Sequence, residues 1–274
     1  AAFLERLETC GYTISAEKSR FGFSSATFCK MVVEKDHVEI SKTHKEAVNN
    51  IAEPNSSESL RSFIGLVTFF APYIIGFSEI MNPMMQSLNS EIREGKWYWG
   101  PEQKRAFRHI KDQINRSVGL QKPDLEPGAY PLELWTDASK FCIAQILVQR
   151  SRKDGIKRLI DAKSRRLNKN EVSKSIFRKE ALSLFCGLTH WKHLLINQKT
   201  PVEIYIDSRS IWSAIENSKT SSSLAQLISD IQHNINPCTI HWQDTKSHSL
   251  CDFFTRCFDD GNRKTEKTRE LKLL

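Results

Sequence analysis

Residues 131–140 read PLELWTDASK, and this short stretch decides the fold of the second half of the chain. Its apolar residues predict a buried β-strand, yet the run ends in an aspartate, Asp137. Aspartate is a poor strand former, and a buried carboxylate costs several kcal/mol unless another group pairs with it. The position of Asp137 therefore raises the question of which groups elsewhere in the chain accompany it.

Downstream of this strand, the sequence alternates between strand and helix patterns. Strands are expected at about 131–136, 142–149, 156–162, 202–207 and 238–243, and helices at about 175–196, 210–217, 222–234 and 248–257. Three strands followed by alternating helices and strands imply a mixed five-stranded sheet with helices on its faces. The expected fold class is α/β, in its α+β form.

Upstream of the sheet, the pattern is mainly helical. A helix near 57–70 follows a serine N-cap with Glu58 in a capping arrangement, and Pro72 ends it. Its apolar residues share one face, and further helices are expected after Pro83 and from Pro101. A small helical domain is therefore expected ahead of the sheet.

Turn residues and charge divide the rest of the chain. The start reads as the end of a helix closed by Gly11, followed by two short strands with a turn at 34–36. Residues 122–128 are dense in turn formers and read as a linker, and the last residues read as a charged tail. The expected divisions are 1–40, 41–120, 128–258 and 259–274.

The composition is that of a globular protein with a hydrophobic core. The 274 residues are 39% hydrophobic and 26% charged, and no apolar run approaches the roughly 18 residues that a bilayer requires, so no membrane partner is expected. The net charge of +8 permits a polyanionic partner, and solvated lysines explain it equally well. Seven cysteines without a CxxC pair favour reduced thiols over a zinc site.

Four acidic residues lie at the ends of predicted strands or on predicted helices, at positions that a role as solvent-exposed surface charges explains poorly. Asp137 and Asp207 end two strands that can be neighbours in a mixed sheet, and Glu180 and Asp252 lie on helices that can pack beside them. Clustered carboxylates repel one another unless cations neutralise them, and oxygen ligands select hard ions such as Mg²⁺ or Mn²⁺. Two such ions suit phosphodiester hydrolysis.

The motifs around these acids resemble the ribonuclease H domain of gypsy-type LTR retrotransposon polyproteins. The matching segments are TDAS at 136–139, LVQ at 147–149, DAKSRRL at 161–167, KEAL at 179–182, WKHLL at 191–195, VEIYID at 202–207 and DFFTR at 252–256. Their order and spacing follow the family pattern without large gaps. The resemblance implies a ribonuclease H-like fold for residues 128–258.

The first half resembles the preceding part of the same polyproteins. YTISAEKSRFG at 12–22 is similar to the segment after the polymerase palm strands, FCKMVV at 28–33 to the primer-grip hairpin, and LRSFIGLVTFFAPYI at 60–74 with WGPEQKRAFRHIK at 99–111 to the thumb. The resemblance covers about residues 3–258. The chain contains no Tyr-x-Asp-Asp palm motif, so this fragment alone is not expected to extend DNA.

The resemblance implies an endonuclease that hydrolyses the RNA strand of RNA–DNA hybrids within an RNA-directed DNA polymerase polyprotein. Asp137, Glu180, Asp207 and Asp252 would be the catalytic and metal-binding residues, holding two Mg²⁺ ions, or Mn²⁺, with Asp137 as the bridge. Expected partners are the hybrid, the template–primer duplex, the palm and fingers upstream, an integrase downstream and a second subunit. The expected location is cytoplasmic, in a retroelement particle, with the nucleus as a second location.

Several further residues are candidates for nucleic-acid contact. The set comprises Arg61, Gly65 and Phe69 on the thumb helix, Ser139 after the first acid, and Arg150 and Lys153 in a basic hairpin. Helix packing explains Gly65 equally well, and a solvated turn explains the hairpin. His248 is an auxiliary candidate near the last acid, with His241 as its rival.

The chain departs from the family pattern around the acids. CIAQIL stands at 142–147 where relatives have GIGAVL, and Ser208 replaces the histidine that normally follows the third acid. A diverged active element and a decaying copy both fit these changes. The alternatives are therefore an inactive hybrid-binding or scaffold module of the same origin, and a related nuclease such as an integrase, against which the thumb-like first half argues.

Overall fold

The computed structural model describes residues 2–216, apart from residues 20, 75, 96 and 197, and residues 238–243. Helix α1 (Ala2–Thr9) precedes a small antiparallel sheet with the order β1-β2-β3-β4. Its strands are β1 (Ala26–Phe28), β2 (Met31–Val33), β3 (His37–Ile40) and β4 (Leu120–Gln121). Within the described residues, no helix is both long and apolar enough to cross a bilayer.

Residues 21–41 contain one more strand than expected, and β4 is a further strand that the sequence pattern did not indicate. The predicted turn at residues 34–36 joins β2 to β3, and an additional tight turn at Cys29 and Lys30 joins β1 to β2. Cys29 and Lys30 have positive φ angles of 47° and 72°. Glycine is the usual residue in this conformation, and neither turn residue is a glycine. The prediction of two strands was wrong because this turn lacks the usual glycine signal.

The helical part packs around one hydrophobic core. Its helices are α2 (Lys42–Asn49), α3 (Ser57–Thr68), the short 3₁₀ helix η1 (Ala71–Tyr73), α4 (Phe77–Glu94) and α5 (Pro101–Arg116). The core includes Leu60, Phe63 and Val67 of α3, which the apolar spacing had placed on one face. Helix α4 begins before Pro83 instead of after it, so the prediction of that start was wrong.

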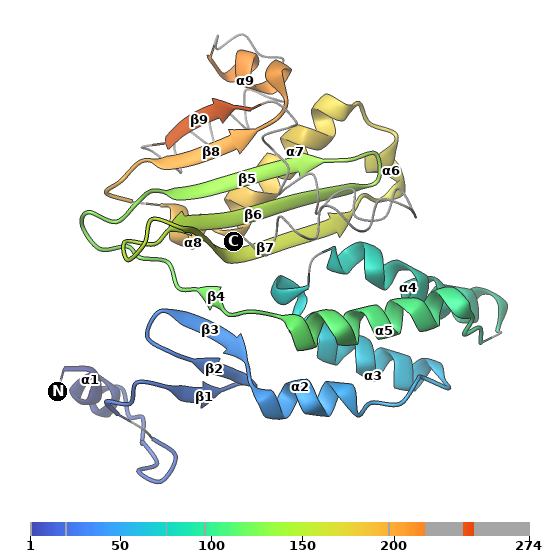
Figure 1. The fold of residues 1–274 in the computed structure, drawn as a ribbon, viewed down its shortest axis with the longest axis horizontal. Helices are drawn as coiled ribbons and strands as arrows, with labels where there is room; N and C mark the ends of the chain where they lie inside the picture. The colour runs from blue at the N-terminus through green and yellow to red at the C-terminus, as the bar shows by residue number, and fades with distance from the viewer. Residues whose placement is uncertain are drawn as a thin grey trace.

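The second half forms a five-stranded mixed sheet with the order β7-β6-β5-β8-β9, as Figure 1 shows. Its strands are β5 (Leu132–Ala138), β6 (Cys142–Arg150), β7 (Lys157–Arg166), β8 (Val202–Ile206) and β9 (Cys238–Trp242). Strands β5, β6 and β7 form an antiparallel meander, while β5 runs parallel to β8 and β8 parallel to β9. The expected fold class is confirmed, including the central β5–β8 pair.

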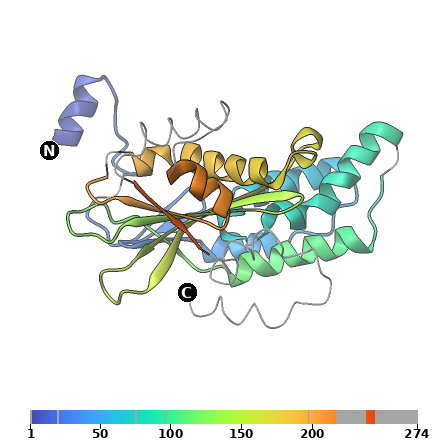
Figure 2. The same ribbon diagram turned by 90° about the horizontal axis from the view of Figure 1, so that it is seen from above.

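Helices cover one face of this sheet. They are α6 (Lys169–Val172), α7 (Ile176–His190), α8 (Lys192–Leu195) and α9 (Arg209–Glu216). Leu134, Leu147 and Ile204 of the sheet share a core with Leu184 and Leu188 of α7, and Figure 2 shows α7 along one side of the sheet. The predicted helices at 222–234 and 248–257 lie outside the described residues.

The two halves meet along the β7 edge of the sheet, above the helical part in Figure 1. Ser78 of α4 donates a hydrogen bond to the Ser164 carbonyl of β7 at 2.6 Å. Lys153, in the β6–β7 turn, forms an ion pair of 2.6 Å with Asp36 in the β2–β3 turn. These contacts join segments that are 86 and 117 residues apart in the chain.

Candidate active site

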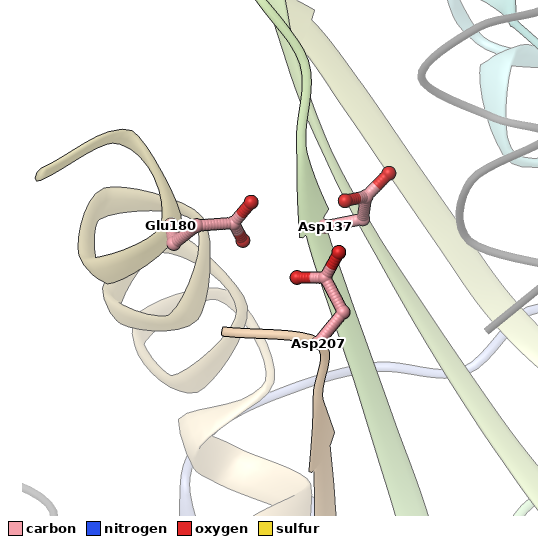
Figure 3. Close-up of side chains that lie close together, drawn as sticks. All are labelled: Asp137, Glu180 and Asp207. Atoms are coloured by element: carbon pink, nitrogen blue, oxygen red, sulfur yellow. The ribbon is translucent and has the colours of Figure 1, made fainter. Parts of the chain in front are cut away.

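Three of the four predicted acids lie together where the neighbouring strands β5 and β8 of the five-stranded sheet end. One carboxylate oxygen from each of Asp137, Glu180 and Asp207 lies within 4.8 Å of the others. Figure 3 shows the Glu180 side chain extending from its helix toward the two aspartates at the strands. Asp137 and Glu180 are buried, with 2% and 6% of their surface exposed, whereas Asp207 is partly exposed.

The parallel pairing of β5 and β8 brings the two aspartates together. Thr136 of β5 is opposite Ile206 of β8, and the next residues along the two strands are Asp137 and Asp207. Two parallel strands in register place their carboxyl ends at the same edge of a sheet. Asp137 and Asp207 are therefore adjacent because β5 and β8 are parallel neighbours, as the order of the elements in the sequence predicted.

Helix α7 supplies the third carboxylate from the covered face of the sheet. Leu184 and Leu188 anchor it on the sheet core, and Glu180 lies one turn before Leu184, near the helix start. Lys179, only 6% exposed, donates to the Lys140 carbonyl at 2.9 Å. The helix start is thus attached to the β5–β6 turn, which begins two residues after Asp137.

Buried polar side chains also connect α7 to the strands near Asp137. The Ser183 hydroxyl, which is fully buried, lies 2.8 Å from the Asp137 carbonyl oxygen and 3.0 Å from that of Ala144. Gln145 Nε2 donates to the same hydroxyl at 2.9 Å. Sequence reasoning missed Ser183 and treated Gln145 only as a departure from a family pattern, because no local signal indicates a contact across 38 residues.

The site is chemically suited to a hard divalent cation. Its donor atoms are all carboxylate oxygens, within 4.8 Å of one another, and two of the three side chains are buried. Mg²⁺ and Mn²⁺ prefer such oxygen ligands, and an uncompensated cluster of anions in a buried site is costly. Asp137, Glu180 and Asp207 therefore fit the metal-binding role that the sequence predicted for them.

Two predicted site residues, Asp252 and His248, lie outside the described residues. His241 is described, and it lies on β9 with its ring stacked on Tyr205 at a centroid distance of 4.8 Å. Tyr205 stacks in turn on Trp135 at 4.2 Å. This aromatic row gives His241 a packing contact, whereas its auxiliary role stays a prediction.

The three candidates on and just after the thumb-like helix α3 are exposed, with Phe69 as the C-cap residue of the helix. Arg61, Gly65 and Phe69 are spaced by four residues, and all three are exposed, with 48% of the Phe69 surface open. Outside its own helix turn, no described heavy atom lies within 4 Å of the position that a Cβ of Gly65 would take. Tight helix packing therefore does not explain this glycine, and the face is open for a partner.

The basic hairpin between β6 and β7 is engaged in ion pairs instead. Lys153 and, more weakly, His37 hold the pKa of Asp36 well below its ordinary value. Arg152 binds both carboxylate oxygens of Asp124 at 2.7 and 2.8 Å, and Arg150 lies 3.9 Å from Glu133. These cations join the hairpin to the rest of the chain, which the sequence pattern did not indicate.

Ser139, the remaining nucleic-acid candidate, shapes the turn after Asp137. Only 8% of its surface is exposed, and its hydroxyl accepts the backbone N–H of Cys142 at 3.0 Å. A serine that accepts a nearby backbone N–H is a common way to form such a turn. Its contact with nucleic acid stays a prediction.

Comparisons with known proteins agree with this geometry. Residues 99–202 match the family described as the RNase H-like domain found in reverse transcriptase. The Tf2-3 and Tf2-4 transposon polyproteins of Schizosaccharomyces pombe are each 25% identical over 214 residues, covering 78% of this chain. The chain spans only 16% of the length of these relatives.

Solved structures of a foamy viral protease–reverse transcriptase share the fold. The complex with an RNA/DNA hybrid has a TM-score of 0.68 and 22% identity, over 89% of this chain and 32% of that one. The complex with dsDNA has a TM-score of 0.67 and 21% identity, over 89% and 50% of the two chains. The chain is therefore similar to LTR retrotransposon polyproteins, and its residues 99–202 match the RNase H-like domain found in reverse transcriptase.

Proposed function

We propose that this chain is the thumb and nuclease region of a retroelement reverse transcriptase, and that it hydrolyses the RNA strand of RNA–DNA hybrids. The observation that carries the proposal is the convergence of Asp137, Glu180 and Asp207 within 4.8 Å at the ends of two adjacent strands. The likeness to a reverse transcriptase whose structure contains an RNA/DNA hybrid supports the choice of substrate.

The carboxylates of the chain would bind and orient the reacting groups. Asp137 and Glu180 are buried and held by the strand and helix that carry them, so their oxygens are oriented in advance. Asp252 would complete the set. Two divalent cations bound there would supply the Lewis acidity that activates water and stabilises the departing 3′ oxygen.

Substrate selection would depend on contacts with the sugar and phosphate groups. The 2′-hydroxyl distinguishes RNA from DNA in the minor groove of a hybrid, and backbone contacts carry no base information. The exposed face with Arg61, Gly65 and Phe69 is suited to a duplex backbone, because glycine allows close approach beside an aromatic ring and a cation. Sequence preference should therefore be slight.

The wider assignment follows from the polyprotein relatives. Because the chain spans 16% of their length, we propose that palm and fingers lie upstream and an integrase downstream in the full protein. A second subunit and a location in a cytoplasmic particle, or in the nucleus, belong to the same proposal.

The decisive experiment is a hybrid-cleavage gel with Mg²⁺, comparing the wild type with Asp207→Asn. The wild type should cut the RNA strand of a hybrid and leave single-stranded RNA and an all-DNA duplex intact, and EDTA should stop the reaction. Asp207→Asn should lower the rate by at least about 100-fold, because a lost ligand exceeds the effect of a lost outer contact.

A wild type that binds the hybrid without cutting it, at any Mg²⁺ or Mn²⁺ concentration, would favour the inactive binding module. Equal cleavage by the wild type and Asp207→Asn would instead point to a contaminating nuclease. A matched surface variant, Asp112→Asn on helix α5, should cut like the wild type.

A further inference from the structure

We infer that Ser183 and Gln145 form a positioning pair that sets the distance between Glu180 and Asp137 and thereby tunes the affinity for divalent cations. The inference rests on the proposed function, since it concerns the same three carboxylates. It assigns a role to two uncharged side chains that join helix α7 to the strands beside the cluster.

Ser183 connects the helix that carries one carboxylate to the backbone of the residue that carries another. Its hydroxyl hydrogen is shared between the carbonyl oxygens of Asp137, at 2.8 Å, and Ala144, at 3.0 Å. These two residues are directly opposite each other on β5 and β6. The serine therefore bridges both strands at the level of the first acid.

Glu180 and Ser183 are three residues apart on α7, so they lie on the same side of the helix. A shift of α7 along the sheet would move the Glu180 carboxylate away from Asp137 and would also break the serine bridge. The surrounding Leu184 and Leu188 contacts are apolar and non-directional, and they resist such a sliding motion less than a hydrogen bond does.

Gln145 orients the serine. Its Nε2 donates to Ser183 Oγ at 2.9 Å, which leaves the hydroxyl hydrogen to point toward the two carbonyl oxygens. Both side chains are essentially inaccessible, with 1% and 0% exposure, so water does not compete for these bonds. The helix accommodates the glutamine because Gly187 lies above it, where an added Cβ would be 3.2 Å from Gln145 Cγ.

A purely structural role for this pair makes a different prediction from a positioning role. If the bonds only satisfy buried polar atoms, their loss lowers the thermal midpoint and leaves the folded site unchanged. If they set the carboxylate geometry, their loss also weakens metal binding in protein that is still folded. Contacts that orient metal ligands typically change the metal affinity about 10- to 100-fold.

The test uses the full 274-residue chain and Mn²⁺ alone, with binding followed by electron paramagnetic resonance of free Mn²⁺. Ser183→Ala removes the bridge, and Ile110→Ala on α5 is the destabilising control, because it opens a fully buried position in the core of the helical part without touching the bridge or α7. Thermal melting and circular dichroism establish that each variant is folded at the temperature of the titration.

We expect the Mn²⁺ dissociation constant to rise about tenfold or more in Ser183→Ala and to stay within about twofold of wild type in Ile110→Ala. Equal dissociation constants for Ser183→Ala and the wild type would overturn the positioning role and leave the proposed nuclease intact. A wild type that does not bind Mn²⁺ would overturn the proposed function and, with it, this inference.

If Ser183→Ala does not fold, Gln145→Met takes its place. This change keeps the length of the side chain and removes the donor that orients the serine. A weaker Mn²⁺ affinity than wild type supports the positioning pair, and an unchanged affinity in folded Gln145→Met overturns it.

Discussion

At the scale of single residues, the site holds three carboxylates so close together that each raises the electrostatic energy of the others. Asp137 and Glu180 are buried, which weakens the screening by water, and Asp207 completes the cluster. Repulsion among these carboxylates is therefore expected to lower the free energy of unfolding when no cation is bound. This effect can be measured as a change in thermal stability.

We predict that Asp207→Asn stabilises the protein in EDTA. Removing one negative charge from the cluster lowers the repulsion, and changes of this kind at functional sites commonly add about 1 kcal/mol to the free energy of unfolding. For a chain of this size, the thermal midpoint should rise by about 2 to 4 °C at pH 7 and low salt. The variant should also lose most of the stabilisation that Mg²⁺ gives to the wild type.

The control for this prediction is Asp112→Asn, which removes an exposed carboxylate paired with Arg116 at 2.9 Å on helix α5. Its thermal midpoint should stay level or fall slightly, because the lost ion pair lies at the surface. A decrease in the midpoint of Asp207→Asn of the same size or larger would contradict the idea that the carboxylate cluster is strained.

A second residue-scale prediction concerns Glu171, which pairs with Arg165 through two hydrogen bonds of 2.8 and 2.9 Å. The Arg165 guanidinium lowers the pKa of Glu171 from its ordinary value of 4.5 to about 2. Because the folded-state pKa is lowered, the stabilisation is complete above pH 4.5 and is lost as the pH falls through about 2. The pair is partly exposed, so its contribution is about 1 kcal/mol or less.

Glu171→Gln should therefore lower the thermal midpoint at pH 7, and the difference from the wild type should shrink steadily as the pH decreases below 4.5. Glutamine keeps the ability to accept the Asn168 backbone N–H that Glu171 accepts, so the helix cap is preserved. A difference that stays constant from pH 7 to pH 3 would show that the charge of Glu171 contributes nothing.

At the scale of elements, local signals predicted most helices and strands because they act over a few residues. The start of α3 is an example: Ser56 accepts the N–H of Ser59, and Ser59 Oγ accepts the N–H of Ser56. The serine cap was expected, but its reciprocal partner is Ser59 instead of Glu58. One exception among the helices is α4, where Pro83 lies inside the helix although proline usually marks a start or an end. Another is the single helix expected at about 175–196, which is divided into α7 and α8.

We predict that Ser56→Ala lowers the free energy of unfolding by about 1 kcal/mol, because the first turn of α3 loses its side-chain acceptor. Ser62→Ala, at an exposed position in the middle of the same helix, should change it by less than about 0.5 kcal/mol. Chemical denaturation of both variants measures the difference. Equal effects would mean that the cap contributes no more than any surface serine of this helix.

At the scale of the whole molecule, the fold divides the basic residues into two groups. Lys153 forms an ion pair with Asp36 across the two halves, whereas Arg61 is on the exposed face of α3 with Gly65 and Phe69. The 40 Lys and Arg residues therefore overstate the number of cations that are free to meet a phosphate backbone.

We predict that the two groups respond differently when hybrid affinity is measured against salt concentration in the presence of EDTA. Arg61→Ala should reduce the slope of log K against log salt by about 1, because one phosphate contact is lost. Lys153→Ala should leave the slope nearly unchanged, since its ammonium group is paired with Asp36 within the protein. A larger change for Lys153→Ala than for Arg61→Ala would place the hybrid on the hairpin instead.

The sequence by itself determined the order of elements, and with it the mixed sheet in which β5 and β8 are parallel neighbours. Hydrophobic periodicity and turn residues act locally, so they are readable from one sequence, and strand topology then implied that Asp137 and Asp207 would meet. Only the tertiary structure decided that Ser183 contacts Gln145 and that Lys153 is paired with Asp36. Such contacts join residues 38 and 117 positions apart, and they depend on how whole elements pack, which no short stretch of sequence encodes.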